Sequence, residues 1–131
     1  MKTDSLSKLL VVFLISFLSS CSDDDSQNNT PNSREVKYEL TGNAVGTFNI
    51  SYVTGSNTGA GAVPTALPWS KDEVAQQGSF VATMTAVVYG ANPGQTITAK
   101  IYVGGVVKKE QTETVQSNGS AVISSLQYVL Q

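Results

Sequence analysis

The sequence contains no histidine and only one cysteine among its 131 residues. Histidine is the usual general base near neutral pH and the commonest metal ligand, so its absence argues against both kinds of site. A single cysteine cannot form a disulfide within the chain, and it offers no cluster of thiols for zinc. We therefore expect a protein that is not an enzyme, that uses no cofactor or metal, and that is stabilised by its core alone.

Charge is also scarce, because charged residues make up 14% of the chain and the formal net charge is -2. The part that we expect to fold, residues 35–131, is nearly neutral, which argues against a nucleic-acid partner. Four of its six carboxylates form two pairs along the sequence, Asp72 with Glu73 and Glu110 with Glu113. Residues three apart on a strand face opposite sides, and neither pair is placed for two-carboxylate catalysis. We expect both pairs to be solvated surface.

One long apolar run occurs near the start of the chain, LLVVFLISFL at residues 9–18. It follows Lys2 and Lys8 and precedes small residues, which is the arrangement of a secretory signal peptide. A membrane-spanning helix needs about 20 apolar residues, so this run is too short to cross a bilayer. We predict a signal peptide over residues 1–20.

The cysteine, Cys21, comes directly after this segment. The sequence LSSC that it ends resembles the lipobox of bacterial lipoproteins, in which the cysteine is acylated and becomes the new N-terminus. The alternative is a free thiol, which would be a liability in an oxidising compartment. Two or more acyl chains anchor a protein stably in a membrane. We predict that Cys21 is the lipidation site and the membrane anchor.

The residues after Cys21 are serine and aspartates: Ser22, Asp23, Asp24 and Asp25. They resemble the export signal of surface lipoproteins of Bacteroidota, and this resemblance implies display on the outer membrane. Two alternatives stay open, a solvated acidic spacer and retention in the inner membrane. The polar residues that follow are typical of a flexible tether, so we assign residues 21–34 to the lipidated cysteine and its tether.

Residues 35–131 show the alternation of β-strands. Apolar and polar residues alternate in VKYEL (36–40), TFNISYV (47–53) and TITAKIYV (96–103), and FVATMTAVVY (80–89) is typical of a central strand. Turn signals recur every 8–12 residues, which indicates a β-sandwich or a small barrel. We predict an all-β fold with one core that includes Leu40, Phe48, Ile50, Trp69, Ile97 and Ile101.

Several turns and one helix are predicted between these strands. Pro93 and Gly94 fit a type II turn, Gly104-Gly105 fits a tight hairpin, and Ser117-Asn118-Gly119 fits another hairpin. Ser70 and Glu73 have the spacing of a capping box, which predicts a short helix ending near Gly78. The glycine-rich segment at 54–64 lacks the lysine and helix of a phosphate-binding loop, so we expect a long mobile hairpin loop.

The aromatic residues are the remaining candidates for a binding site. Trp69, in ALPWSK, is the only tryptophan, and a lone tryptophan is more often part of a core than a ligand platform. The alternative is a sugar- or lipid-stacking surface that includes Trp69, Tyr52, Tyr89 and Tyr102. Burial of the Trp69 indole would favour the first interpretation, and exposure in a concave site would favour the second.

The ordered set VKYELTG, FNISYVTGS, LPWSK and GQTITAKIYVGGVV resembles the C-terminal domain of the MmpS family, small mycobacterial membrane proteins that accompany RND-type lipid transporters. The resemblance implies a small Ig-like antiparallel β-sandwich of about seven strands. Family members usually have a cysteine where Ala99 stands, and an N-terminal transmembrane helix in place of the predicted lipid anchor. No catalytic residues follow from the resemblance.

Two functions remain open at this stage. The first is an anchored, non-catalytic accessory module that binds an envelope protein, with a transporter as the partner that the resemblance implies. The second is a surface lipoprotein that binds a lipid or a glycan near Trp69.

Overall fold

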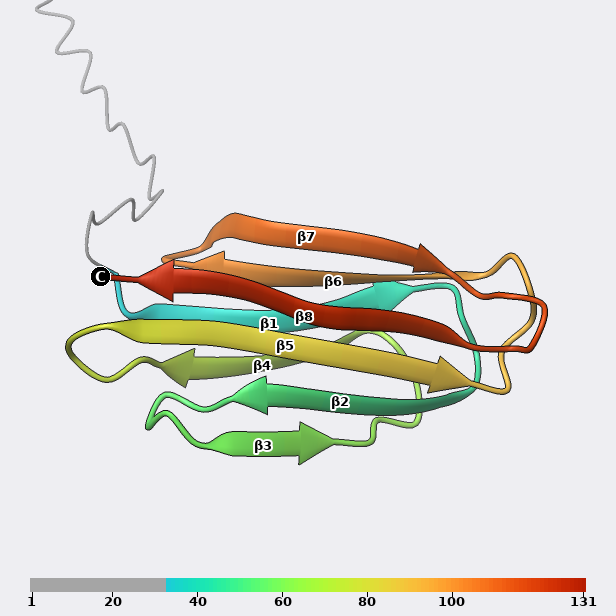
Figure 1. The fold of residues 1–131 in the computed structure, drawn as a ribbon, viewed down its shortest axis with the longest axis horizontal. Helices are drawn as coiled ribbons and strands as arrows, with labels where there is room; N and C mark the ends of the chain where they lie inside the picture. Colours follow the sequence, from blue (N-terminus) through green and yellow to red (C-terminus); the bar gives the residue numbers. More distant parts are fainter. Residues whose placement is uncertain (1–32) are drawn as a thin grey trace, which may run out of the picture.

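The computed structural model describes residues 33–131 (Figure 1). The predicted signal peptide, Cys21, the acidic residues after it and the tether as far as residue 32 lie outside the described residues. The all-β prediction is confirmed, with eight strands in place of about seven: β1 (Glu35–Gly42), β2 (Thr47–Val53), β3 (Gly59–Ala62), β4 (Trp69–Val74), β5 (Phe80–Tyr89), β6 (Thr96–Val103), β7 (Val106–Thr114) and β8 (Ala121–Leu130).

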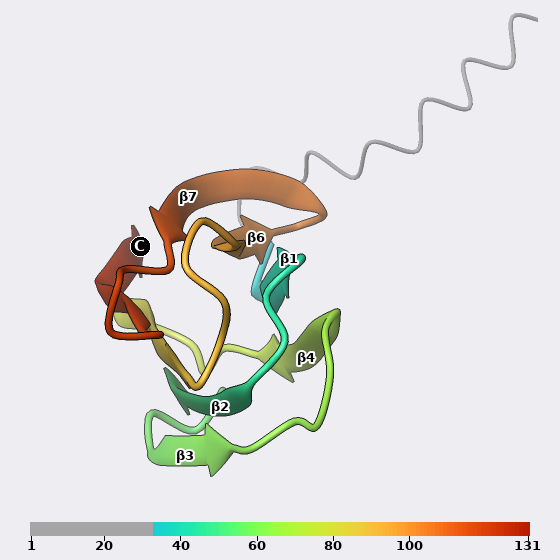
Figure 2. The ribbon, with the colours of Figure 1, turned by 90° about the vertical axis from the view of Figure 1, so that its right-hand side faces the viewer.

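The strands form two four-stranded antiparallel sheets that face each other as a sandwich. Sheet A has the order β4-β1-β6-β7, and sheet B has the order β3-β2-β5-β8. Figure 2 shows the two layers end-on, with β7 beside β8 on one side and β4 and β3 on the other. The two sheets therefore have four edge strands in all, β4 and β7 in sheet A and β3 and β8 in sheet B.

The core lies between the sheets and follows the alternation of the sequence. On β1, Val36, Tyr38 and Leu40 are buried while their neighbours are partly exposed. Five of the six predicted core residues are fully buried: Leu40, Phe48, Ile50, Ile97 and Ile101. Trp69 is only partly buried against this core. Because β4 is an edge strand, its inward side chains have a neighbouring strand of sheet A, β1, on one side and none on the other.

The predicted turns between strands are largely confirmed. The amide of Gln95 donates to the carbonyl of Asn92 at 3.1 Å, and Gly94 has a φ of 90°. Gly104 and Gly105 have φ values of 58° and 79°, as a two-residue hairpin between β6 and β7 requires. The prediction of a hairpin at residues 117–119 is wrong, because this turn carries the chain from sheet A to sheet B.

Two other sequence-based expectations are also wrong. The predicted helix from Ser70 is strand β4, because residues 69–74 pair with β1 from Leu40 to Glu35. This pairing outweighs the local capping-box spacing. The expected long loop at 54–64 is a tight turn followed by β3, and the amide of Thr54 donates to the carbonyl of Thr58 at 2.7 Å. Pairing with β2 holds the Gly-Ala sequence of β3 in strand form.

The first described residues and the C-terminal Gln131 lie at one end of the sandwich, which we call the proximal end (Figure 1). The Arg34 guanidinium donates there to the carbonyls of Gly78 at 2.6 Å and Gln131 at 3.4 Å, and also to Gln76. These bonds fix the point at which the chain enters the sandwich. Within residues 33–131, no helix is long and apolar enough to cross a membrane.

Candidate functional site

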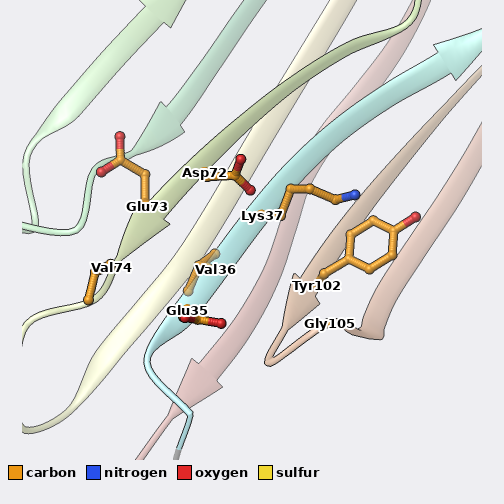
Figure 3. A pocket seen from close by; sticks show the side chains of 8 residues that line it. All are labelled: Glu35, Val36, Lys37, Asp72, Glu73, Val74, Tyr102 and Gly105. Atoms are coloured by element: carbon orange, nitrogen blue, oxygen red, sulfur yellow. The ribbon is translucent and has the colours of Figure 1, made fainter. Parts of the chain in front are cut away.

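A hollow of about 550 Å³ lies on sheet A at the proximal end (Figure 3). It is formed where the start of β1, the end of β4 and the end of β6 meet the Gly104-Gly105 hairpin. Its lining residues are Glu35, Val36, Lys37, Asp72, Glu73, Val74, Tyr102 and Gly105. One of the four aromatic residues proposed as binding residues, Tyr102, is therefore part of this hollow.

The polar groups around Tyr102 are engaged with one another. The Tyr102 hydroxyl donates to Glu39 Oε1 at 2.8 Å, and Lys37 Nζ lies 3.5 Å from Glu39 Oε2. Lys37 Nζ also lies 4.2 Å from the centroid of the Tyr102 ring, a cation–π contact, and Figure 3 shows the two side chains next to each other. Partial burial and the hydrogen bond to the Glu39 carboxylate raise the pKa of Tyr102.

The carboxylates of the hollow do not converge on one point. Asp72 is opposite Lys37 in the β1–β4 pairing, and Glu35 is opposite Val74. Glu73 points away from the hollow (Figure 3), and its Oε2 accepts from the Gly55 amide at 3.1 Å. Among residues 33–131, no three histidine, cysteine, aspartate or glutamate residues are grouped as metal ligands. The carboxylates that line the hollow thus lack the convergence that a metal site or a pair of catalytic carboxylates needs.

Tyr52 and Trp69 lie together on the opposite side of β1, between the sheets. The ring centroids of Tyr52 and Trp69 are 5.7 Å apart, and the ring centroids of Tyr52 and Tyr38 are 5.4 Å apart. Tyr38 is fully buried and donates its hydroxyl to the Val53 carbonyl at 2.7 Å, which joins sheet A to sheet B. Burial raises the pKa of Tyr38 to about 12.

The four aromatic residues proposed as a binding surface are therefore dispersed. Tyr52 and Trp69 contact each other with tilted rings, whereas Tyr102 lies at the proximal end and Tyr89 closes β5 at the opposite end. Trp69 is partly buried, between the two outcomes that the sequence analysis distinguished. Trp69 is not among the residues that line the hollow at the proximal end.

Charge is divided unequally between the two sheets. Within residues 33–131, every charged side chain except that of Arg34 lies on a strand of sheet A. The strands of sheet B have the sequences TFNISYV, GAGA, FVATMTAVVY and AVISSLQYVL, which contain none. We call the outward side of sheet B the uncharged face. Val122 and Val129 on it are each about half exposed, at 52% and 51%.

The uncharged face is hollowed near β3 by a shallow trough of about 440 Å³. Its lining residues come from β2, β3 and β5: Ser51, Tyr52, Val53, Gly59, Ala60, Gly61, Thr83 and Thr85. Tyr52, a candidate binding residue from the sequence, is among them, but the trough as a whole was not predicted. The absence of charge from four separate segments was visible in the sequence, but their membership of one sheet was not.

The chain was also compared with known proteins. It matches the sequence model of the family described as Mycobacterium membrane protein over residues 5–126. The chain belongs to this family. No curated protein was found to match it. Membership of the Mycobacterium membrane protein family supports a location at a membrane or in the cell envelope, and it confirms the resemblance seen in the sequence.

One departure from the family pattern can be placed in the structure. Ala99, where the resemblance leads us to expect a cysteine, is fully buried on β6 opposite Gln111 of β7. Residues 33–131 contain no cysteine at all. This member of the Mycobacterium membrane protein family therefore holds its sandwich together without a disulfide, through the core between the two sheets.

Proposed function

We propose that this member of the Mycobacterium membrane protein family is a lipid-anchored, non-catalytic accessory protein of the cell envelope, whose domain binds a protein partner through the uncharged face. The observation that carries the proposal is the division of charge between the sheets. The cores of protein–protein interfaces are depleted in charged residues relative to other surfaces. The uncharged face has this composition, with exposed valines among serine, threonine, asparagine and glutamine side chains.

The position of the chain's start supports the anchored part of the proposal. Arg34 is fixed at the proximal end, so a lipid on Cys21 would hold that end toward the membrane. The thirteen residues from Ser22 to Arg34 can span about 45 Å when fully extended. Both sheets would then stand clear of the bilayer with their faces open to other envelope proteins. Ser22 to Asp25 would direct the protein to the outer-membrane surface, and the family resemblance makes a transporter the first partner to test.

A lipid- or glycan-binding function is less well supported. A stacking platform needs an exposed aromatic ring, whereas Trp69 is partly buried and packs against Tyr52. Tyr89 is exposed but lies apart from that pair. We therefore keep ligand binding as the second function.

The test compares the two faces of the full-length protein in its own cells. A photo-reactive residue replaces Val122 on the uncharged face or, as the control, the exposed Ser70 on the outward side of sheet A. We expect a discrete protein adduct from position 122 that is lost when Val81→Lys is added. We expect none from position 70. Equal adducts from both positions, or none from position 122, would contradict the proposal.

A further inference from the structure

Three of the four edge strands carry features that block pairing with another chain. An edge strand exposes unpaired backbone groups, and proteins protect it with charges, bulges or a covering element. Strand β4 carries Lys71, Asp72 and Glu73. Strand β7 carries charges as well: Lys108, Lys109, Glu110 and Glu113.

The edge of β8 is protected in a different way. Its register against β5 shifts between Met84 and Ala86, and Ser125 has a φ of 53°, so the strand is bulged at its middle. Strand β7 also lies beside it across the sandwich (Figure 2). The edges of β4, β7 and β8 are therefore all unsuited to pairing with a further strand.

Strand β3 lacks the charges, the bulge and the covering strand of the other edges, and its length of four residues is its one protective feature. Its sequence is GAGA, and it pairs with β2 in unbroken register from Val53 opposite Gly59 to Ile50 opposite Ala62. It has no charge, no proline and no bulge. Figure 2 shows β3 at the margin of the sandwich, next to β2 alone within its sheet. The backbone of β3 is thus open for hydrogen bonding along its outer side.

The fold itself does not require the glycines of β3. A Cβ on Gly59 would meet nothing within 4 Å, and one on Gly61 would come no closer than 3.5 Å to the Ile50 carbonyl. Neither residue has a positive φ. By contrast, a Cβ on Gly55 would lie 1.9 Å from the Val74 carbonyl. Glycine within a strand is less stable than alanine, because it loses more backbone freedom on folding. Such glycines often mark a place where another backbone approaches closely.

We infer that β3 is the docking strand of this protein, to which an extended, uncharged segment of an envelope protein partner adds as a fifth strand of sheet B. Added strands gain affinity from main-chain hydrogen bonds and specificity from alternate side chains. The outward side chains of the added strand would lie across Gly59 and Gly61 into the trough. The trough walls, among them Val53, Thr83 and Thr85, offer no charge to pair with. The segment therefore carries uncharged side chains at alternate positions, because an unpaired charge buried there would be costly.

A second copy of this chain fits the same edge less well. The outward residues of β3 are Gly59 and Gly61, so a paired copy would bring no side chain into the trough. The identification of the partner as a protein rests on the proposed function.

The test places a photo-reactive residue at Val63, which is exposed and directly follows β3. The full-length protein is cross-linked in whole cells, and the partner residues in the adduct are sequenced by mass spectrometry. We expect a partner segment with uncharged side chains at alternate positions. Gly61→Lys should reduce the adduct at least tenfold without shifting the denaturation midpoint, whereas the control Ser70→Lys should leave it unchanged.

The other outcomes separate this inference from the proposed function. An adduct between two copies of the chain would overturn the inference. So would a Val63 adduct that persists in Gly61→Lys. If adducts from Val122 survive in either case, the proposed function stands while docking at β3 fails. If neither Val63 nor Val122 gives an adduct with another protein, both are wrong.

Discussion

Replacing Tyr38 by phenylalanine removes one hydroxyl from the centre of the sandwich and leaves the ring in place. That hydroxyl donates to the Val53 carbonyl at 2.7 Å and is the link between β1 of sheet A and β2 of sheet B. Leaving a buried acceptor without its partner costs about 1–3 kcal/mol. Val53 is only partly buried, so water can replace part of the lost bond. We therefore expect Tyr38→Phe to lower the free energy of unfolding by about 1–2 kcal/mol at pH 7.

The same substitution should change the response to alkaline pH. Burial raises the pKa of Tyr38 to about 12 in the folded protein, above the ordinary value of 10.0. The neutral hydroxyl therefore contributes stability that is fully present below pH 10. This contribution is lost as the pH rises through the folded-state pKa. A two-unit shift corresponds to about 2–3 kcal/mol in full. We expect the stability difference between parent and Tyr38→Phe to shrink, and then to reverse, between about pH 10 and 12.

The assay is urea denaturation followed by the fluorescence of Trp69, the only tryptophan. The slope with denaturant should be the same for both proteins, because the substitution leaves the buried area nearly unchanged. Taking the difference between the two proteins removes the contribution of every other group that titrates above pH 10. A variant as stable as its parent at pH 7, or a difference that does not change with pH, would refute this account of Tyr38.

Three further predictions concern the core, the turns and the anchor. Trp69→Ala should lower the free energy of unfolding by about 2–3 kcal/mol, less than for a fully buried tryptophan, and no loss in a denaturation series would mean that the indole faces water. Gly42→Ala should destabilise the protein by more than about 2 kcal/mol, because the added Cβ would lie 2.1 Å from the Thr96 carbonyl oxygen. Gly59→Ala should be neutral or slightly stabilising, because its Cβ would meet nothing within 4 Å. Equal effects of the two substitutions on thermal unfolding would contradict this role of the glycines. Cys21→Ala should abolish acylation of the N-terminus, and an unmodified cysteine in mass spectra of the parent would disprove the lipid anchor.

The fold was predictable wherever the alternation of residues was regular. Strands β1, β2 and β6 alternate cleanly, so their buried residues could be named from the sequence, and Pro93-Gly94 and Gly104-Gly105 define their own turns. Strand β3 could not be predicted, because Gly-Ala-Gly-Ala has no strand propensity of its own and is held only by pairing with β2. Ser70 to Glu73 has a helical capping pattern that pairing with β1 outweighs.

The candidate site was largely hidden from the sequence. Sequence reasoning works along the chain, whereas the uncharged face depends on which strands share a sheet. A tight turn joins β2 to β3, but the chain passes through sheet A before it returns to sheet B as β5 and again as β8. The position of Trp69 illustrates the same limit. Its residue type favoured the core, but β4 lies at the edge of sheet A, and this edge position leaves the indole only partly covered.

Hydrogen exchange of the anchored protein tests the central claim most directly. The backbone amides of β3 and β4 are compared between native membranes, which retain the partner, and the purified protein in detergent. The account predicts that β3 exchanges more slowly in the native membranes, because a partner covers sheet B there, while β4 of sheet A exchanges at the same rate in both. Equal exchange of β3 in both samples, or protection of β4 alone, would contradict it.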